Sequence, residues 1–217
     1  MGIQRVFSVL ALSAAALLLP GGPVGAMDFS LPRVDAESYA SSIAEEASYF
    51  GISEVRLGPA FSNLELLPKL LVIPDSSSLN KARLDSLQFD VLFRPPQLEA
   101  WHWIGSPRPS IGGVIGLGGY ESLIHAGIDW HIPLGSTPFY LEAGGGVGIH
   151  NGYLDHAPPG FHNLGCRTLL HWEAGAGWNL SPNVDVTLQW QHMSNVVFGC
   201  DPNDGLNDIG MVVGWKF

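Results

Sequence analysis

The chain closes with Ile209-Gly210-Met211-Val212-Val213-Gly214-Trp215-Lys216-Phe217. Every second position holds a bulky apolar residue, from Ile209 to Phe217, while the positions between them hold Gly210, Val212, Gly214 and Lys216. A period of two is that of a β-strand, whose successive side chains point to opposite faces. Bulky apolar residues on one face and small or polar ones on the other are typical of a strand that crosses a membrane in a barrel.

Seven earlier runs have strand character as well. They span residues 54–63, 87–94, 110–119, 122–134, 138–151, 167–180 and 184–195, and the closing run spans 207–217. In the fourth run Ile124 and Ile132 alternate with His125 and Asp129. Apolar residues outside and polar residues inside are the inverse of a soluble barrel. The sequence therefore predicts an all-β fold, an eight-stranded antiparallel transmembrane β-barrel over residues 52–217.

The first 26 residues have the pattern of a secretory signal peptide. Arg5 precedes an apolar stretch that ends at Leu19, and the small residues Gly25 and Ala26 mark a cleavage point. Residues 27–51 form an N-terminal extension in which 35–47, rich in alanine and acidic residues, predicts a short helix. No later stretch has the roughly 18 consecutive apolar residues of a membrane helix.

The charge of the chain argues against a nucleic-acid partner. Its net charge is −10, and removal of Arg5 with the signal peptide gives −10 − 1 = −11. Only 14% of the residues are charged, with 27 glycines and 7 tryptophans, a composition that suits a membrane barrel better than a solvated enzyme. An ordinary secreted β-sandwich is the alternative that this composition leaves open.

The two cysteines, Cys166 and Cys200, are candidates for a disulfide, since an even count in an exported protein favours pairing. Both fall in long connections, 152–166 and 196–206, whereas 135–137 and 181–183 are tight turns. Outer-membrane barrels have short periplasmic turns and longer external loops. We therefore expect the two cysteines at the external end. The connection 95–109 is long for a periplasmic turn.

The predicted inner faces carry many ionisable residues. We interpret them as a structural polar network rather than a second active site, because a buried charge is costly unless it is paired. They are Arg56, Asp90, His125, Asp129, His131, Glu142, His171, Glu173 and Lys216. The glycine-rich stretch 144–148 lacks the lysine and hydroxyl residue of a phosphate-binding loop, and close packing inside a narrow barrel explains it better.

Chemistry is suggested where the last two runs meet. His192 and Ser194 lie two residues apart, so they share the outward face of one strand, and Asn207 begins the next strand on the same face. A serine nucleophile needs a base, and the base needs a third group that holds its orientation. The alternative interpretation is a pair of polar rim residues at the level of the lipid headgroups.

These residues resemble the outer-membrane lipid A 3-O-deacylases, also called the PagL or acyloxyacyl hydrolase family. The resemblance rests on His192-Met193-Ser194-Asn195, on Asn203-Asp204-Gly205-Leu206-Asn207, on the closing 210–217 and more loosely on 52–58. It implies an eight-stranded barrel with its site facing the membrane. By the same resemblance, Ser194 is the nucleophile, His192 the general base and Asn203 an oxyanion donor.

The third position of the triad departs from the family pattern, which has an acidic residue where Asn207 stands. Asparagine can orient a histidine, but it cannot stabilise the imidazolium by charge. Asp208 is adjacent but inward by phase, and Asp204 lies in the loop. All three stay open as the third member of the triad.

From this resemblance we expect a serine esterase, a hydrolase in the outer membrane of a Gram-negative bacterium, that removes the 3-O-acyl chain of lipid A. The expected partners are lipid A, as lipopolysaccharide, and outer-membrane lipids; no metal or cofactor is implied, and homodimer formation is left open. The alternatives are a different lipid esterase, such as a phospholipase, and a non-catalytic barrel with a structural or ligand-binding role.

Overall fold

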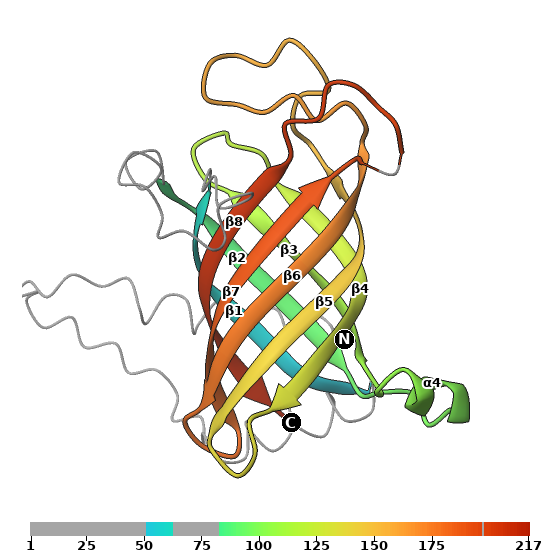
Figure 1. Cartoon of the computed structure of the whole chain (residues 1–217). Coiled ribbons are helices and arrows are strands. Elements are labelled where there is room, and N and C mark those ends of the chain that lie inside the picture. Colours follow the sequence, from blue (N-terminus) through green and yellow to red (C-terminus); the bar gives the residue numbers. More distant parts are fainter. Residues whose placement is uncertain (1–50, 63–82, 197) are drawn as a thin grey trace, which may run out of the picture. The chain divides into compact units, whose positions relative to one another are not determined.

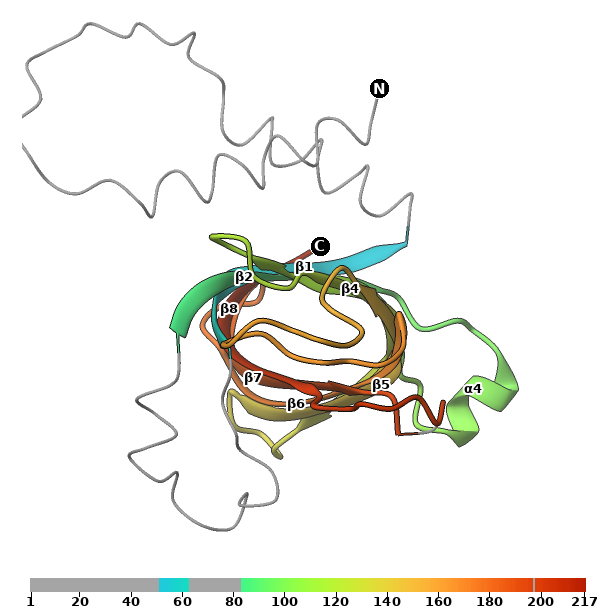
Figure 2. The same cartoon turned by 90° about the horizontal axis from the view of Figure 1, so that it is seen from above.

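The computed structural model describes residues 51–62, 83–196 and 198–217. Residues Ile52–Lys216 form one compact unit, which is a closed antiparallel barrel of eight strands in sequence order (Figures 1 and 2). The strands are β1 Ile52–Ser62, β2 Arg83–Phe93, β3 Arg108–Gly116, β4 Leu123–Pro133, β5 Phe139–His150, β6 Thr168–Asn179, β7 Val184–Ser194 and β8 Leu206–Lys216. The predicted fold class is confirmed. The expected signal peptide and the helix within 35–47 lie outside the described residues.

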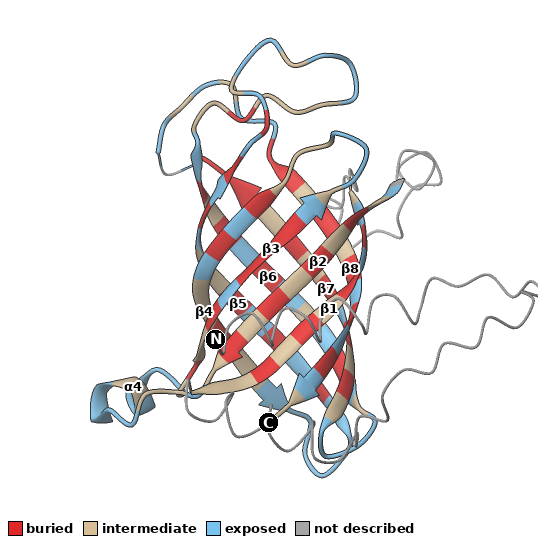
Figure 3. Ribbon diagram, turned by 180° about the vertical axis from the view of Figure 1, so that it is seen from behind, coloured by how far each residue is buried: buried red, intermediate tan, exposed pale blue. Residues whose placement is uncertain are grey.

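Alternation along the strands gives the barrel its apolar outer surface. In β8, Met211, Val213 and Trp215 are about half exposed, while Gly210 and Gly214 between them are buried. The same two-residue alternation runs around the barrel (Figure 3). Side chains with the hydrophobicity of a protein core are thus on the outside, as a bilayer requires.

The two ends of the barrel differ, as the loop lengths predict. Connections 134–138 and 180–183 are tight turns at one end, whereas 151–167 and 195–205 rise from the other end (Figure 1). The long connection between β2 and β3, at the turn end, contains a short helix, α4 Glu99–Trp103. The indole N–H of Trp101 in this helix donates a hydrogen bond to the Pro107 carbonyl at 2.6 Å. In the described part of the chain, no helix is long and apolar enough to cross a membrane.

The lumen near the turn end is filled by ion pairs. Arg56 pairs with Glu54 and donates to both carboxylate oxygens of Glu142, each at 2.6 Å. Arg108 reaches Glu54 at 2.7 Å, Asp129 at 2.5 Å and Glu142 at 2.9 Å. These contacts agree with a structural role for the inward charges. Arg108 was not among the expected members, since it begins β3 directly after the long connection.

Towards the loop end the lumen is closed by apolar side chains instead. The buried cluster comprises Val114, Leu123, Leu164, Leu169, Met193 and Leu206. Leu164 comes from the loop 151–167 and reaches into the barrel with none of its surface exposed. The interior is therefore packed at this end, and the loops are anchored to it.

Candidate active site

The candidate site lies where β7 ends and β8 begins, next to the long loops. His192 of β7 is the cross-strand partner of Asn207 of β8. Directly opposed residues of antiparallel strands project from the same face, so their side chains meet. The distance between His192 Nδ1 and Asn207 Oδ1 is 3.0 Å, a hydrogen bond. The structure thus brings together two of the three residues expected in the triad.

This hydrogen bond determines which imidazole nitrogen carries the proton. The Asn207 carbonyl oxygen can only accept, so Nδ1 of His192 must donate. In the neutral ring Nε2 is then an acceptor, the nitrogen that a general base presents to a serine hydroxyl. Asn207 therefore fixes the orientation and tautomer of the His192 ring without adding a charge.

Ser194 shares the strand and the face of His192, two residues further on. It is 8% exposed, more buried than its outward phase suggests, and it is the last residue of β7. Its hydroxyl forms no hydrogen bond with any described residue, His192 included. Catalytic hydrogen bonds are often loose in the unliganded enzyme and tighten around the substrate.

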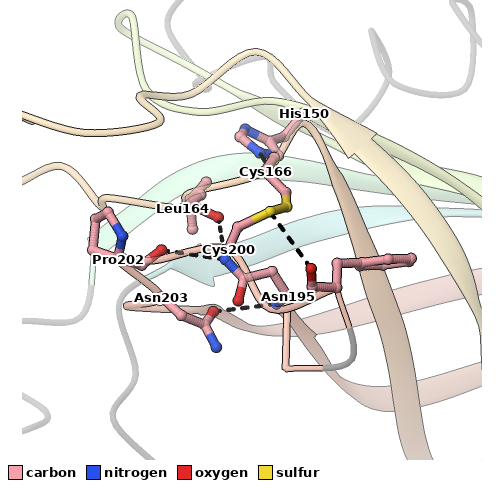
Figure 4. The surroundings of a disulfide bond; sticks show 8 residues. His150, Leu164, Cys166, Asn195, Cys200, Pro202 and Asn203 are labelled. Atoms are coloured by element: carbon pink, nitrogen blue, oxygen red, sulfur yellow. Dashed lines mark hydrogen bonds between the residues drawn. A yellow bond between two sulfur atoms is a disulfide. The ribbon is translucent and has the colours of Figure 1, made fainter.

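Asn203 lies in the loop between β7 and β8 and bonds to the backbone beside Ser194. Its side-chain oxygen accepts from the backbone N–H of Asn195 at 3.2 Å (Figure 4). That contact orients the Asn203 amide and leaves its N–H₂ group as a donor. The Asn195 side chain in turn donates to the carbonyls of Leu164 at 2.8 Å and Pro202 at 3.2 Å. Asn195 therefore holds both loops at the site.

A disulfide joins the same two loops. Cys166 and Cys200 are bonded, with their Cα atoms 5.7 Å apart (Figure 4). Cys166 is two residues from the start of β6, and Cys200 is three residues before Asn203. The bond therefore ties the segment that carries the candidate oxyanion donor to the rim of the barrel.

The two aspartates considered as alternatives to Asn207 have other partners. Asp204 accepts from both the backbone N–H and the side-chain amide of Asn163, at 2.7 and 3.0 Å. Asp208 is buried and points into the barrel, one residue past Asn207 and on the opposite face. Neither contacts His192, so the geometry favours Asn207.

Two residues beside His192 were missed by sequence reasoning. The indole of Trp190 lies nearly parallel to the His192 ring, at an interplanar angle of 12° and 5.9 Å between centroids. Gly205 has φ +68°, and a Cβ there would lie 3.3 Å from His192 Cε1. Trp190 was identifiable from its position two residues before His192. The approach of Gly205 depends on the loop conformation, so no sequence pattern indicated it.

A small cavity with a mixed polar and apolar lining adjoins Asn207, and Asp208, Glu121 and His162 are among its lining residues. Glu121 accepts a hydrogen bond from the His162 backbone at 2.9 Å, and the His162 ring lies 3.5 Å away. Burial opposes ionisation of this carboxyl, but hydrogen bonds from His162 hold the pKa of Glu121 below its usual value. Glu121 is thus an anion near the site. It belongs to the neighbouring cavity and makes no contact with His192.

The fold and this site define a class of protein: an outer-membrane β-barrel with a histidine and a serine on its outward face. The family model for lipid A 3-O-deacylase (PagL) matches residues 88–216. The chain therefore belongs to the PagL lipid A 3-O-deacylase family, a family of hydrolases, and is a protein of the Gram-negative outer membrane. No curated protein matches it.

Among solved structures, the crystal structure of the outer membrane enzyme PagL shares the fold, and two further outer-membrane barrels are similar. The crystal structure of the outer membrane enzyme PagL is 14% identical with a TM-score of 0.52, over 76% of this chain and 100% of that chain. The N-terminal barrel domain of Pseudomonas aeruginosa OprF is 10% identical, with a TM-score of 0.45 over 76% of this chain and 98% of its own. Neisserial surface protein A is 10% identical, with a TM-score of 0.44 over 76% and 96%.

Proposed function

We propose that this protein is a serine esterase that hydrolyses the 3-O-acyl ester of lipid A. The observation that carries the proposal is the His192 to Asn207 hydrogen bond on the outward face, two residues from Ser194, in a chain of the lipid A 3-O-deacylase family. A polar pair on the lipid-facing surface is costly unless it has a function or lies at the interface.

The reaction follows from the protonation state of the histidine. As Ser194 Oγ attacks the ester carbonyl, Nε2 of His192 takes the hydroxyl proton and passes it to the departing sugar oxygen. An Oγ–acyl bond forms and the sugar–acyl bond breaks. Water then attacks the acyl-enzyme with His192 again as base, which releases the fatty acid and restores the Ser194 hydroxyl. Asn207 holds the imidazole throughout.

Asn203 is the proposed oxyanion donor. Its side-chain oxygen is occupied by the Asn195 backbone, so its N–H₂ group is the part available to a substrate. Negative charge on the ester oxygen develops beside Ser194 and needs such a donor already in place. Removal of one oxyanion donor typically costs about 100- to 1,000-fold in rate.

The position of the site suits a lipid that stays in the membrane. His192 and Ser194 lie on the outer surface near the loop end, at the last residues of β7. An acyl ester on a lipid A sugar lies at the boundary between headgroup and acyl chains. The substrate therefore reaches the site by lateral diffusion in the outer leaflet.

A non-catalytic barrel is the second candidate, and Asn207 is the residue that favours it. A neutral amide gives no electrostatic help to an imidazolium, and loss of the acid in a serine triad can cost several orders of magnitude. The hydrogen bond from His192 argues the other way, because it keeps the orienting role of the third residue.

The test is release of 3-hydroxy fatty acid from lipid A in mixed micelles, measured by mass spectrometry. We expect activity in the wild type and none in Ser194→Ala or His192→Ala. Ser136→Ala, in the exposed turn at the opposite end, is the matched control and should retain full activity. Equal activity in wild type and Ser194→Ala would rule out the mechanism. No activity in either would favour the non-catalytic barrel, and acid released only from phospholipid would favour a phospholipase.

A further inference from the structure

Two carboxylates in the middle of the lumen stand apart from the ion-pair network. Within the described chain, Arg56 and Arg108 pair with Glu54, Asp129 and Glu142. Neither Asp90 nor Glu173 has an arginine or lysine partner among the described residues, although they are only 3% and 8% exposed. A buried charge without a partner is strongly unfavourable. Protonation of these carboxyls or a bound cation would remove that cost.

Each of these carboxylates lies beside a histidine. His125 Nε2 is 3.5 Å from Asp90 Oδ1, and His171 Nε2 is 3.9 Å from Glu173 Oε2. The two imidazole rings are stacked, with 3.8 Å between centroids and 19° between planes. Two protonated rings at that distance would repel each other, so histidine charge is a poor source of the compensation.

Several side-chain atoms of this cluster lack protein partners, whereas Glu173 Oε2 accepts a hydrogen bond from Gln189 Nε2 at 2.9 Å. Both ring nitrogens of His125, Nε2 of His171 and both carboxylate oxygens of Asp90 are buried and form no hydrogen bond with a described residue. Such groups in a protein interior nearly always have a partner, and each one left without costs about 1–3 kcal/mol. Acceptor atoms without donors gathered around two histidines are what a metal ion requires.

The glycine stretch of β5 makes the cluster possible. His125 is on β4 and His171 on β6, and the strand between them presents Gly144, Gly146 and Gly148 to the lumen. With no side chains there, the two imidazoles lean together across β5. A Cβ at Gly144 would collide with the Glu173 side chain. The glycine-rich stretch 144–148 thus provides the space for these residues.

We propose that His125, His171 and Glu173 bind a divalent transition-metal ion of the zinc class inside the barrel. One ring nitrogen or carboxylate oxygen from each residue lies within 4.8 Å of the others. Ligands of tetrahedral zinc are about 3.4 Å apart at bonds of about 2.1 Å, so side-chain rotations of about 1 Å complete the set. Two imidazoles and one carboxylate favour zinc over calcium or magnesium, which prefer oxygen ligands.

Asp90 has a supporting role in this site. A histidine that binds a metal usually donates a hydrogen bond from its other ring N–H to an acceptor such as a carboxylate. That hydrogen bond fixes the orientation of the ring and raises its basicity. Asp90 is the carboxylate beside His125. With Asp90 and Glu173 both ionised, a divalent ion brings the charge of the cluster to zero.

The site is enclosed on both sides. On the side nearer the loops, the next inward residues of β4 and β6 are Leu123 and Leu169, which belong to the apolar cluster. On the side nearer the turns lies the ion pair of Asp129 with Arg108. The ion therefore enters as the barrel folds and exchanges slowly afterwards. This site is separate from His192 and Ser194 and does not depend on the proposed esterase activity.

The experiment uses the full barrel without an affinity tag, refolded in detergent with ZnCl₂ or with EDTA and then desalted. After folding with zinc, we expect elemental mass spectrometry to find about one zinc ion per chain. The zinc-folded sample should also have a higher unfolding midpoint than the EDTA-folded sample. Folding with MgCl₂ should have neither effect. X-ray absorption of the zinc-loaded wild type should show two imidazole ligands.

Glu173→Gln is the near-isosteric test variant and should lower retained zinc at least tenfold. His125→Gln with His171→Gln should abolish zinc binding. His150→Gln, which changes a histidine outside the cluster, is the control and should retain the metal. Wild type without zinc after folding in ZnCl₂, unchanged zinc in Glu173→Gln, or zinc without imidazole ligands would each overturn the proposal. The wild-type measurements decide the matter even if a variant fails to fold.

Discussion

Substitutions at residue 207 can separate two contributions of the third triad residue, orientation of the histidine and electrostatic stabilisation of the imidazolium. Asn207→Ala removes the acceptor for His192 Nδ1, which sits at 3.0 Å. A hydrogen bond to a group that becomes charged contributes about 1.5–3 kcal/mol. We therefore expect kcat for lipid A deacylation to fall roughly 10- to 150-fold. Asn207→Glu keeps an acceptor and adds a charge, so its rate should match or exceed the wild type.

The alternative acids provide the control for this series. Asp204 holds Asn163, and Asp208 points into the barrel, so Asp204→Asn and Asp208→Asn should leave kcat within about twofold if folding is intact. Should one of these aspartate variants lose the activity while Asn207→Ala keeps it, the third member of the triad has been assigned wrongly.

At the scale of the strand, depth in the bilayer determines what an outward charge costs. Met211 is the central residue of β8, and Val213 lies nearer the turn end. Arginine costs about 2–4 kcal/mol at the midplane and about 0–1 kcal/mol near the interface. Met211→Arg should therefore destabilise the barrel more than Val213→Arg in urea unfolding from lipid vesicles.

Gly214→Ser is the inward counterpart in the same strand. A Cβ at Gly214 would lie 2.6 Å from Glu54 Oε1 and also collide with Asp185, so this variant should be destabilised by crowding, equally in thin and thick bilayers. Identical costs for Met211→Arg and Val213→Arg would contradict the assigned depths of these two residues.

The disulfide joins two loops rather than two strands, so it should affect the site more than the barrel. Cys166 and Cys200 are 34 residues apart, and closing such a loop stabilises by about 3–4 kcal/mol in the chain-entropy model. We expect Cys166→Ser with Cys200→Ser to assemble with lower stability and reduced kcat, because Asn203 loses its restraint. Two free thiols in protein isolated from the envelope would disprove the pairing.

At the scale of the whole molecule, the buried ion pairs in the lumen near the turn end stabilise the folded barrel. Arg56 is 1% exposed and serves Glu54 and Glu142 at once. Removal of one partner from a buried ion pair costs about 3–5 kcal/mol, because the other charges stay buried. Arg56→Met should lower the urea midpoint accordingly, whereas the exposed Arg94→Met should not. Equal midpoints would mean that the lumen is hydrated enough to screen these charges.

Much of the barrel was predictable because strand periodicity is local. Apolar residues at every second position indicated the outward face of β4 and β8, and loop length indicated which end is external. The same phase placed His192 opposite Asn207, since antiparallel neighbours joined by one loop share a face at the same end. Burial of Ser194 was not predictable, because the alternation along β7 indicates an outward side chain at this position.

The sequence by itself determined the strands, their faces and the residue types at the site, because each depends only on neighbours along one or two strands. Tertiary structure alone decided that Arg108 joins the lumen network and that Asn195 links the two loops. It also decided that His125 and His171 stack across the glycines of β5. Those contacts join residues separated by whole strands, and their distances are set by closure of the barrel and by which side chains are absent between them.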